Sequence, residues 1–153
     1  MESPDPYNLK HQPVFLLPYQ EHDGPFAGDT DCKFLSVGWA QYNQRAISVK
    51  TLRHTGTKWS RQSEEMPIHR VIDLALLLVS AVRSVGGRIE LPAGTLENQS
   101  GAVTIAAKHA DAAEERDFRR ELLDQAVLRR LGVLLHMLEK MRDENLIESH
   151  PIF

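Results

Sequence analysis

The stretch PIHRVIDLALLLVSAVRSVGG, residues 67–87, predicts the helix on which the rest of the chain is built. Pro67 suits the first position of a helix, where a backbone N–H would have no partner within the helix, and Gly86–Gly87 supplies the stop. Because apolar side chains recur at helical spacing over a wide arc, we expect the helix Pro67–Arg83 to be central, covered over most of its girth, with Ile72 and Leu76 in the core. The arc consists of Ile68, Val71, Ile72, Ala75, Leu76, Leu78, Val79 and Val82.

Upstream of this helix the sequence predicts strands. Phe34–Tyr42 and Ala46–His54 are separated by a three-residue loop, which is typical of a hairpin. In the second, apolar and polar side chains alternate, which predicts one apolar and one wet face. In the first, Leu35, Val37 and Trp39 share one face, and small residues on the other leave room for close packing. Val14–Leu17, which lies between two prolines, is expected to be an edge strand. Glu21–Lys33 is rich in Gly, Pro and Asp and is expected to be a loop.

Downstream, Arg88–Leu91 is expected to be a short strand and Ala112–Asn145 one long helix. Asp111 and Glu114 have the spacing of a capping box at its start. Such a helix is about 45–50 Å long, whereas a globule of this size is nearer 40 Å across. We therefore expect the helix either to bend near Gly132 or to leave the globule and meet a partner. Apolar residues in this helix recur at spacings of 4, 3, 4 and 3, which is typical of a seam between paired helices. The seam consists of Val127, Leu131, Leu134, Leu138 and Met141.

Together these elements predict an α+β fold, in which a small antiparallel sheet packs on a buried helix with a long C-terminal helix beside it. The 153 residues are expected to form a single domain. Within it, residues 1–12 are expected to be a loose arm, residues 13–91 the α+β core, and residues 102–147 a C-terminal helical segment.

The composition excludes several classes of protein. Hydrophobic residues make up 42% and charged residues 25% of the chain, which are values of a folded domain rather than a disordered one. No segment has the roughly 20 apolar residues of a membrane span, and the start lacks the features of a signal peptide. Cys32 is the single cysteine, so we expect a cytoplasmic protein without disulfides. A net charge of −3 makes duplex DNA an improbable partner.

Charge is distributed unevenly along the chain. Residues 1–31 carry six acidic side chains and one basic one, whereas residues 45–70 carry six basic and two acidic ones. A basic segment that runs into the start of a helix can bind an anion. Alternatively, the basic segment pairs with the acidic N-terminal segment of the same chain.

The segment Arg53–Arg70 is the candidate ligand site, and an anionic or nucleotide-like small molecule is the expected ligand. It combines cations, hydroxyls, an indole for stacking and imidazoles that titrate near neutral pH. The alternative is a solvated connection whose tryptophan lies in the core. The candidate ligand-binding residues are Arg53, His54, Lys58, Trp59, Ser60, Arg61 and Arg70.

Enzymatic activity is the second hypothesis, as a small hydrolase or nuclease-like enzyme. His54 or His69 would act as acid or base, Glu64 or Glu65 as its partner, and Arg53 or Arg61 would stabilise charge. His69 and Asp73, four residues apart, could form a base–orienter pair or a plain surface pair. No known catalytic motif is present, and no cofactor or metal site is predicted. Asp29 and Asp31 have the pattern of a turn, and Cys32 that of a small core or turn residue.

The run ISVKTLRHTGTKWSRQSEEMPIHRVIDLALLL, residues 47–78, with DGPFAG and LSVGWAQ upstream, resembles a family of small bacterial proteins of unknown function. The resemblance covers roughly residues 10–85 and implies no activity, cofactor or catalytic residue.

The sequence thus favours a cytoplasmic binding or interaction module that self-associates through its C-terminal helix. A structural subunit of a larger complex is a third hypothesis.

Overall fold

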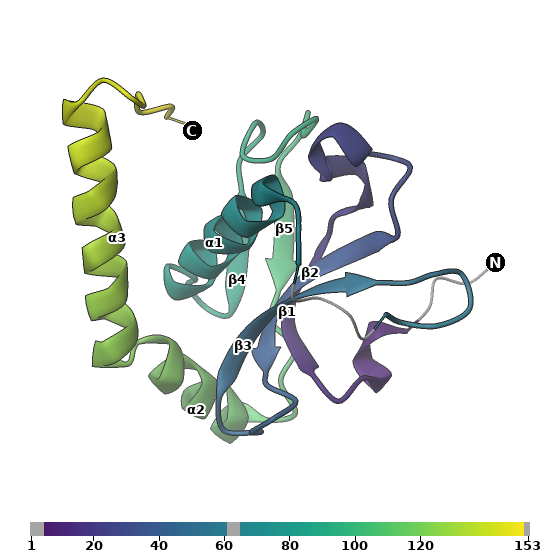
Figure 1. Ribbon diagram of the computed structural model, residues 1–153. Helices are drawn as coiled ribbons and strands as arrows, with labels where there is room; N and C mark the ends of the chain where they lie inside the picture. The colour runs from purple at the N-terminus through teal and green to yellow at the C-terminus, as the bar shows by residue number, and fades with distance from the viewer. Residues whose placement is uncertain (1–4, 61–64, 152–153) are drawn as a thin grey trace.

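The computed structural model describes residues 5–60 and 65–151 and has the predicted α+β architecture (Figure 1). One antiparallel sheet has the strand order β1-β2-β3, and a second consists of β4 and β5. The strands are β1 (Gln12–Pro18), β2 (Cys32–Trp39), β3 (Ile47–Arg53), β4 (Arg88–Leu91) and β5 (Val103–Ala106). The helices are α1 (Ile68–Val82), α2 (Ala112–Leu122) and α3 (Gln125–Asp143), with short 3-10 turns at Pro6–Asn8, Gln20–His22 and Gly24–Phe26. Strand β5 was not predicted, because its four residues lie where the sequence indicates the C-terminal helical segment.

Residues 5–11 are packed against the first sheet and are not the loose arm that the sequence predicts. His11 is buried, with Nε2 2.8 Å from the Ser36 hydroxyl and Nδ1 3.1 Å from the Ser48 hydroxyl. Pro6 is buried as well. The N-terminal segment therefore covers part of the polar side of the hairpin, which was expected to face solvent. Burial is tolerated there because the His11 ring forms hydrogen bonds with the two serine hydroxyls.

Strands β1 and β2 approach each other closely at Gly38. A Cβ atom at this position would lie 2.1 Å from the backbone oxygen of Gln12, so glycine is required. The pairing shifts register between Pro13 and Phe15. There the oxygen of Val14 accepts a 3.0 Å hydrogen bond from the backbone N–H of Lys108, which ties the segment after β5 to the edge of the first sheet.

Helix α1 packs on the body with one face only, which corrects the expectation that it is covered over most of its girth. Its buried apolar residues are Leu74, Leu77 and Ala81, and they contact the core formed with both sheets and α2. Ile72 is 57% exposed and Leu76 36% exposed, so neither is a core residue. The outer stripe of α1, which we define as its exposed apolar face, consists of Ile68, Val71, Ile72, Leu76 and Val79.

The C-terminal segment is two helices, which corrects the prediction of one helix over Ala112–Asn145. Of the two expected solutions, a bend near Gly132 is wrong, because the break lies at Leu123 and Asp124. Helix α2 begins as predicted, with the N–H of Glu114 donating to Asp111 at 2.9 Å. It ends at the buried Leu122, and α3 starts at Gln125, after a link of two residues. The carboxylate of Asp124 caps α3 by accepting from the N–H of Ala126 at 2.8 Å. Leu123 is thus the C-cap of α2, and Asp124 next to it is the N-cap of α3.

Helix α3 stands apart from the body and is attached to it through α2 (Figure 1). None of its 19 residues is buried. The helices within residues 5–60 and 65–151 include none that is long and apolar enough to cross a membrane.

Candidate functional site

The candidate ligand segment starts as a tight, hairpin-like loop after β3. His54 and Trp59 pair as an isolated β-bridge, and their rings meet edge to face with centroids 4.9 Å apart. The Nδ1 atom of His54 accepts a hydrogen bond from the N–H of Gly56 at 3.0 Å. Trp59 also contacts Phe34 of β2, with ring centroids 6.3 Å apart. The indole is thus half-buried at the sheet edge. The sequence left open whether it is exposed for stacking on a ligand or buried in the core, and the observed position is intermediate between the two.

The basic side chains of this segment have acidic partners in the N-terminal segment. Arg53 donates two hydrogen bonds to Asp31, at 2.9 and 3.0 Å. Arg70 donates two hydrogen bonds to Asp23, at 2.9 and 2.7 Å. Both pairs have the planar, two-bond geometry that a guanidinium forms with a carboxylate. Internal pairing, the alternative to anion recognition, therefore accounts for two of the six bases of residues 45–70.

Asp23 is the centre of a buried polar cluster. Its side chain is fully buried, and besides Arg70 it lies 2.8 Å from Nε2 of His69, a side chain that is one-quarter exposed. Burial by itself raises the pKa of Asp23, but the hydrogen bonds from Arg70 and its other partners outweigh burial and lower that pKa. The carboxylate therefore stays charged and ties the loop before β2 to the first turn of α1.

Asp73 is bound by Tyr19, not by His69. The Tyr19 hydroxyl donates to the Asp73 carboxylate, and burial raises the pKa of both side chains. The predicted pair of His69 and Asp73 is therefore wrong, because each side chain has a separate partner in the loop that follows β1. Spacing along one helix could not reveal these partners, which lie 46 and 54 residues away in the sequence.

The remaining candidates do not form one catalytic cluster in the described part of the chain. His54 and His69 have different hydrogen-bond partners, and Glu65 is exposed. Arg61 and Glu64 lie outside the described residues. Lys58 is exposed, and Ser60 is hydrogen-bonded through its N–H to the oxygen of Arg53 at 2.7 Å.

Two further kinds of candidate are the Cys32 thiol and the side chains that could ligate a metal. Cys32 is fully buried, and burial raises the pKa of its thiol to about 12. It is therefore a core residue and not an activated nucleophile. Residues 5–60 and 65–151 include no group of three or more metal-ligating side chains.

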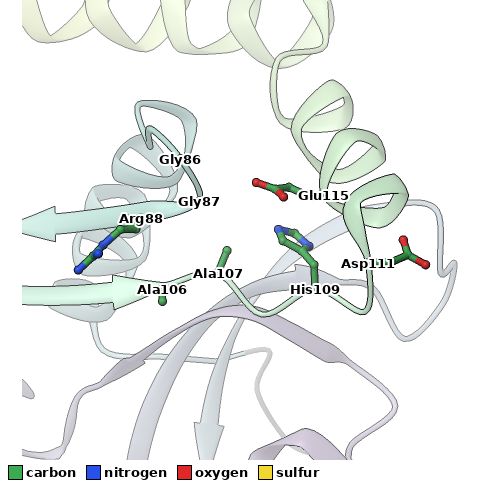
Figure 2. A pocket seen from close by; sticks show the side chains of 8 residues that line it. All are labelled: Gly86, Gly87, Arg88, Ala106, Ala107, His109, Asp111 and Glu115. Atoms are coloured by element: carbon green, nitrogen blue, oxygen red, sulfur yellow. The ribbon is translucent and has the colours of Figure 1, made fainter.

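A pocket of about 300 Å³ lies between the turn after α1, the end of β5 and the start of α2. Figure 2 shows the side chains of His109 and Glu115 pointing toward each other across it. Nδ1 of His109 is buried without a hydrogen-bond partner among the described residues. The pocket offers an imidazole and a carboxylate to a small polar molecule, and its volume is at the lower end of ligand sites. It is lined by Gly86, Gly87, Arg88, Ala106, Ala107, His109, Asp111 and Glu115.

This pocket was not predicted from the sequence, and neither was Asp23 as the partner of His69 and Arg70. The pocket joins three segments whose contact depends on the unpredicted strand β5. For the Asp23 cluster a signal was present, since the acidic N-terminal segment was recognised as a possible partner of the basic one. That signal did not identify which acid meets which base.

These features describe a small α+β protein with two antiparallel sheets and a projecting C-terminal helix. The chain belongs to a family of unknown function, DUF6530, whose sequence profile matches residues 1–143. The match extends to the last residue of α3, well beyond the resemblance at residues 10–85 that the sequence suggested. No curated protein and no solved structure matches the chain.

Proposed function

We propose that this protein is an interaction module that self-associates through α3. The observation that carries the proposal is that α3 is rich in leucine yet has no buried residue. Most of the stability of helices in proteins comes from the packing of an apolar face rather than from the helix alone. Apolar side chains cover more than half the circumference of α3, which is typical of a helix that is covered. The α3 seam, Val127, Leu131, Leu134, Leu138 and Met141, supplies the contact surface.

A second copy of the chain is the partner that the charges on α3 favour. When two such seams pair in antiparallel orientation with Leu134 opposite Leu138 of the partner, Arg130 comes to lie opposite Glu144 of the other copy. This complementary pair occurs twice because of the two-fold symmetry. In a parallel pair Arg130 would instead lie opposite Leu135. Flanking charges set the orientation of helix pairs, so they support an antiparallel dimer.

Anion recognition and catalysis have less support from the geometry. Arg53 and Arg70 already donate to carboxylates, and the two candidate histidines have separate partners. An anionic ligand at the Arg53–Arg70 segment stays a prediction. Membership in a larger complex is compatible with the exposed seam, and it would appear as a parent protein that is monomeric when pure.

The test is the oligomeric state. We expect light scattering to give twice the chain mass of 17.3 kDa at high concentration, with dissociation on dilution. Replacing Leu134 and Leu138 with glutamate should yield a folded monomer, because both side chains are exposed in the single chain. The control carries two glutamates on the outer side of the same helix, Arg129→Glu with His136→Glu, and should remain dimeric. A parent protein that has the mass of one chain over a hundredfold range of concentration contradicts the proposal.

The orientation of the pair has its own test. Arg130→Glu should weaken the dimer, because it places two acids opposite each other at both ends. Adding Glu144→Arg to the same chain should restore association, because the pair is reformed with its charges exchanged. Failure of this rescue would exclude the antiparallel arrangement while leaving the α3 seam as the interface.

A further inference from the structure

The outer stripe of α1 is a second apolar surface without a partner among the described residues. Its members are spaced by 3, 1, 4 and 3 residues, so they form one face, opposite the buried Leu74 and Leu77. Ile68 is 79% exposed and Ile72 is 57% exposed. A contiguous exposed apolar patch of this kind marks an interaction site.

Helix α3 has more apolar surface than an α3 pair can cover. Leu128 and Leu135 lie beside the α3 seam, on one flank, and both are exposed. A two-helix seam covers a narrow stripe, whereas a helix that is apolar over a wider arc needs a second surface. The α3 flank, Leu128 and Leu135, therefore requires an additional partner, and the outer stripe of α1 is an apolar helical face of similar length.

The body of the protein holds α3 away from α1 of the same chain. The link between α2 and α3 is only two residues long, and α2 is anchored by the buried Phe118 and Leu122. The Asp124 cap fixes the direction in which α3 leaves. Figure 1 shows α3 standing clear of α1 as a result. Docking α3 on its own α1 would require the loss of the anchor or of the cap.

We propose that the outer stripe of α1 is the docking surface for α3 of a second copy, which contacts it through the α3 flank. In the dimer each α3 then contacts the partner's α3 through the α3 seam and the partner's α1 through the α3 flank. This inference rests on the proposed self-association and extends it, because each chain supplies both the projecting helix and the surface that receives it. The interface is reciprocal, as two-fold symmetry requires.

Two single substitutions test the docking surface in the full chain. Ile72→Glu changes the outer stripe and Leu135→Glu changes the α3 flank, with His136→Glu as the matched control on the outer side of α3. Each of the first two should weaken the dimer by about tenfold or more, the scale of a lost apolar anchor in an interface. The control should leave the dissociation constant unchanged. Because residue 72 is exposed, the melting temperature of the dissociated Ile72→Glu chain should equal that of the dissociated parent.

Mixing the two variants decides which chain supplies α3. If α3 docks on the partner, a mixed dimer of Ile72→Glu and Leu135→Glu chains retains one intact contact between α1 and α3. The mixed dimer should then be tighter than the dimer of either variant alone. Energy transfer between labelled chains measures the two affinities. If α3 docks on its own chain, both contacts are broken in the mixture and no tighter species forms. That result overturns the inference. An Ile72→Glu dimer with the parent affinity also overturns it, while loss of the dimer in the Leu134→Glu, Leu138→Glu chain still supports self-association. A monomeric parent refutes both proposals.

Discussion

Helices α1 and α3 both carry a continuous stripe of apolar side chains, yet one face of α1 is buried in the body and no residue of α3 is buried. In α1 the inner face is closed by both sheets, whereas α3 has no buried residue. The two helices therefore differ in what stabilises them. Contacts within one chain stabilise α1, and we expect contacts between chains to stabilise α3.

This difference shows that the apolar pattern of a helix does not determine which surface packs against the helix. The outer stripe of α1 and the α3 seam look alike in the sequence, and both look like the buried face of α1. Substitutions on these surfaces should consequently have different effects: those on the inner side of α1 change the stability of the single chain, and those on α3 change the association.

The largest effect is expected for Arg70→Ala on the inner side of α1. It leaves the Asp23 carboxylate buried without its main partner, and breaking a buried pair in this way costs about 3–5 kcal/mol of unfolding free energy. The control is Arg120→Ala, which breaks the exposed pair of Arg120 and Asp117 on α2 and should cost about 0–1 kcal/mol. Urea denaturation of both variants measures the difference. Equal losses would show that the Asp23 cluster does not hold the loop on α1.

Leu77→Ala and Ile72→Ala compare the two faces of α1 directly. Leu77 is buried, so its truncation should cost about 2–5 kcal/mol. Ile72 is exposed, and its truncation should change the unfolding free energy by no more than about 0.5 kcal/mol when measured on the dissociated chain. A large loss from Ile72→Ala in the monomer would mean that another part of the same chain covers the outer stripe.

Acid should destabilise the body through His11. Burial, with a smaller contribution from Lys50, lowers the pKa of His11 to about 4, from 6.5 in the unfolded chain. Between these values the unfolded state binds more protons, so stability is full above about pH 6.5 and falls as the pH drops toward 4, by about 3 kcal/mol in total. Unfolding free energies measured across this range should show a shallower fall for His11→Gln than for the parent. The same slope in both would exclude His11 as the cause.

The smallest effect is expected at Gly132 in the middle of α3. A Cβ atom there meets nothing within 4 Å, and alanine is a better helix former than glycine by about 0.5–1 kcal/mol. Gly132→Ala should therefore raise the helical content of the monomeric Leu134→Glu, Leu138→Glu chain, as followed by circular dichroism. In the dimer it should be neutral or stabilising. A weakened dimer would show that the α3 helices approach each other at Gly132.

Local chemistry made much of the fold predictable. The spacing in β2 placed Leu35 and Val37 on the buried face, whereas Val49, on the predicted apolar face of β3, is exposed. Asp111 and Glu114 marked the start of α2 correctly. The break between α2 and α3 was missed, although Asp124 is a good capping residue, because helix formers on both sides hide it. The candidate site was harder to predict from the sequence, since the hydrogen-bond partners of Asp23 and Tyr19 lie 46 to 54 residues away along the chain.

By itself the sequence determined the class of fold, most of the helices and strands, and the presence of an acidic and a basic segment that could pair. These properties depend on neighbours within a few residues, and a local pattern contains them. Only the tertiary structure decided which face of α1 is buried, which acid meets Arg53 and Arg70, and that α3 leaves the body. Burial and pairing are set by surfaces that come together from distant parts of the chain, so two stripes with the same spacing can have different surroundings.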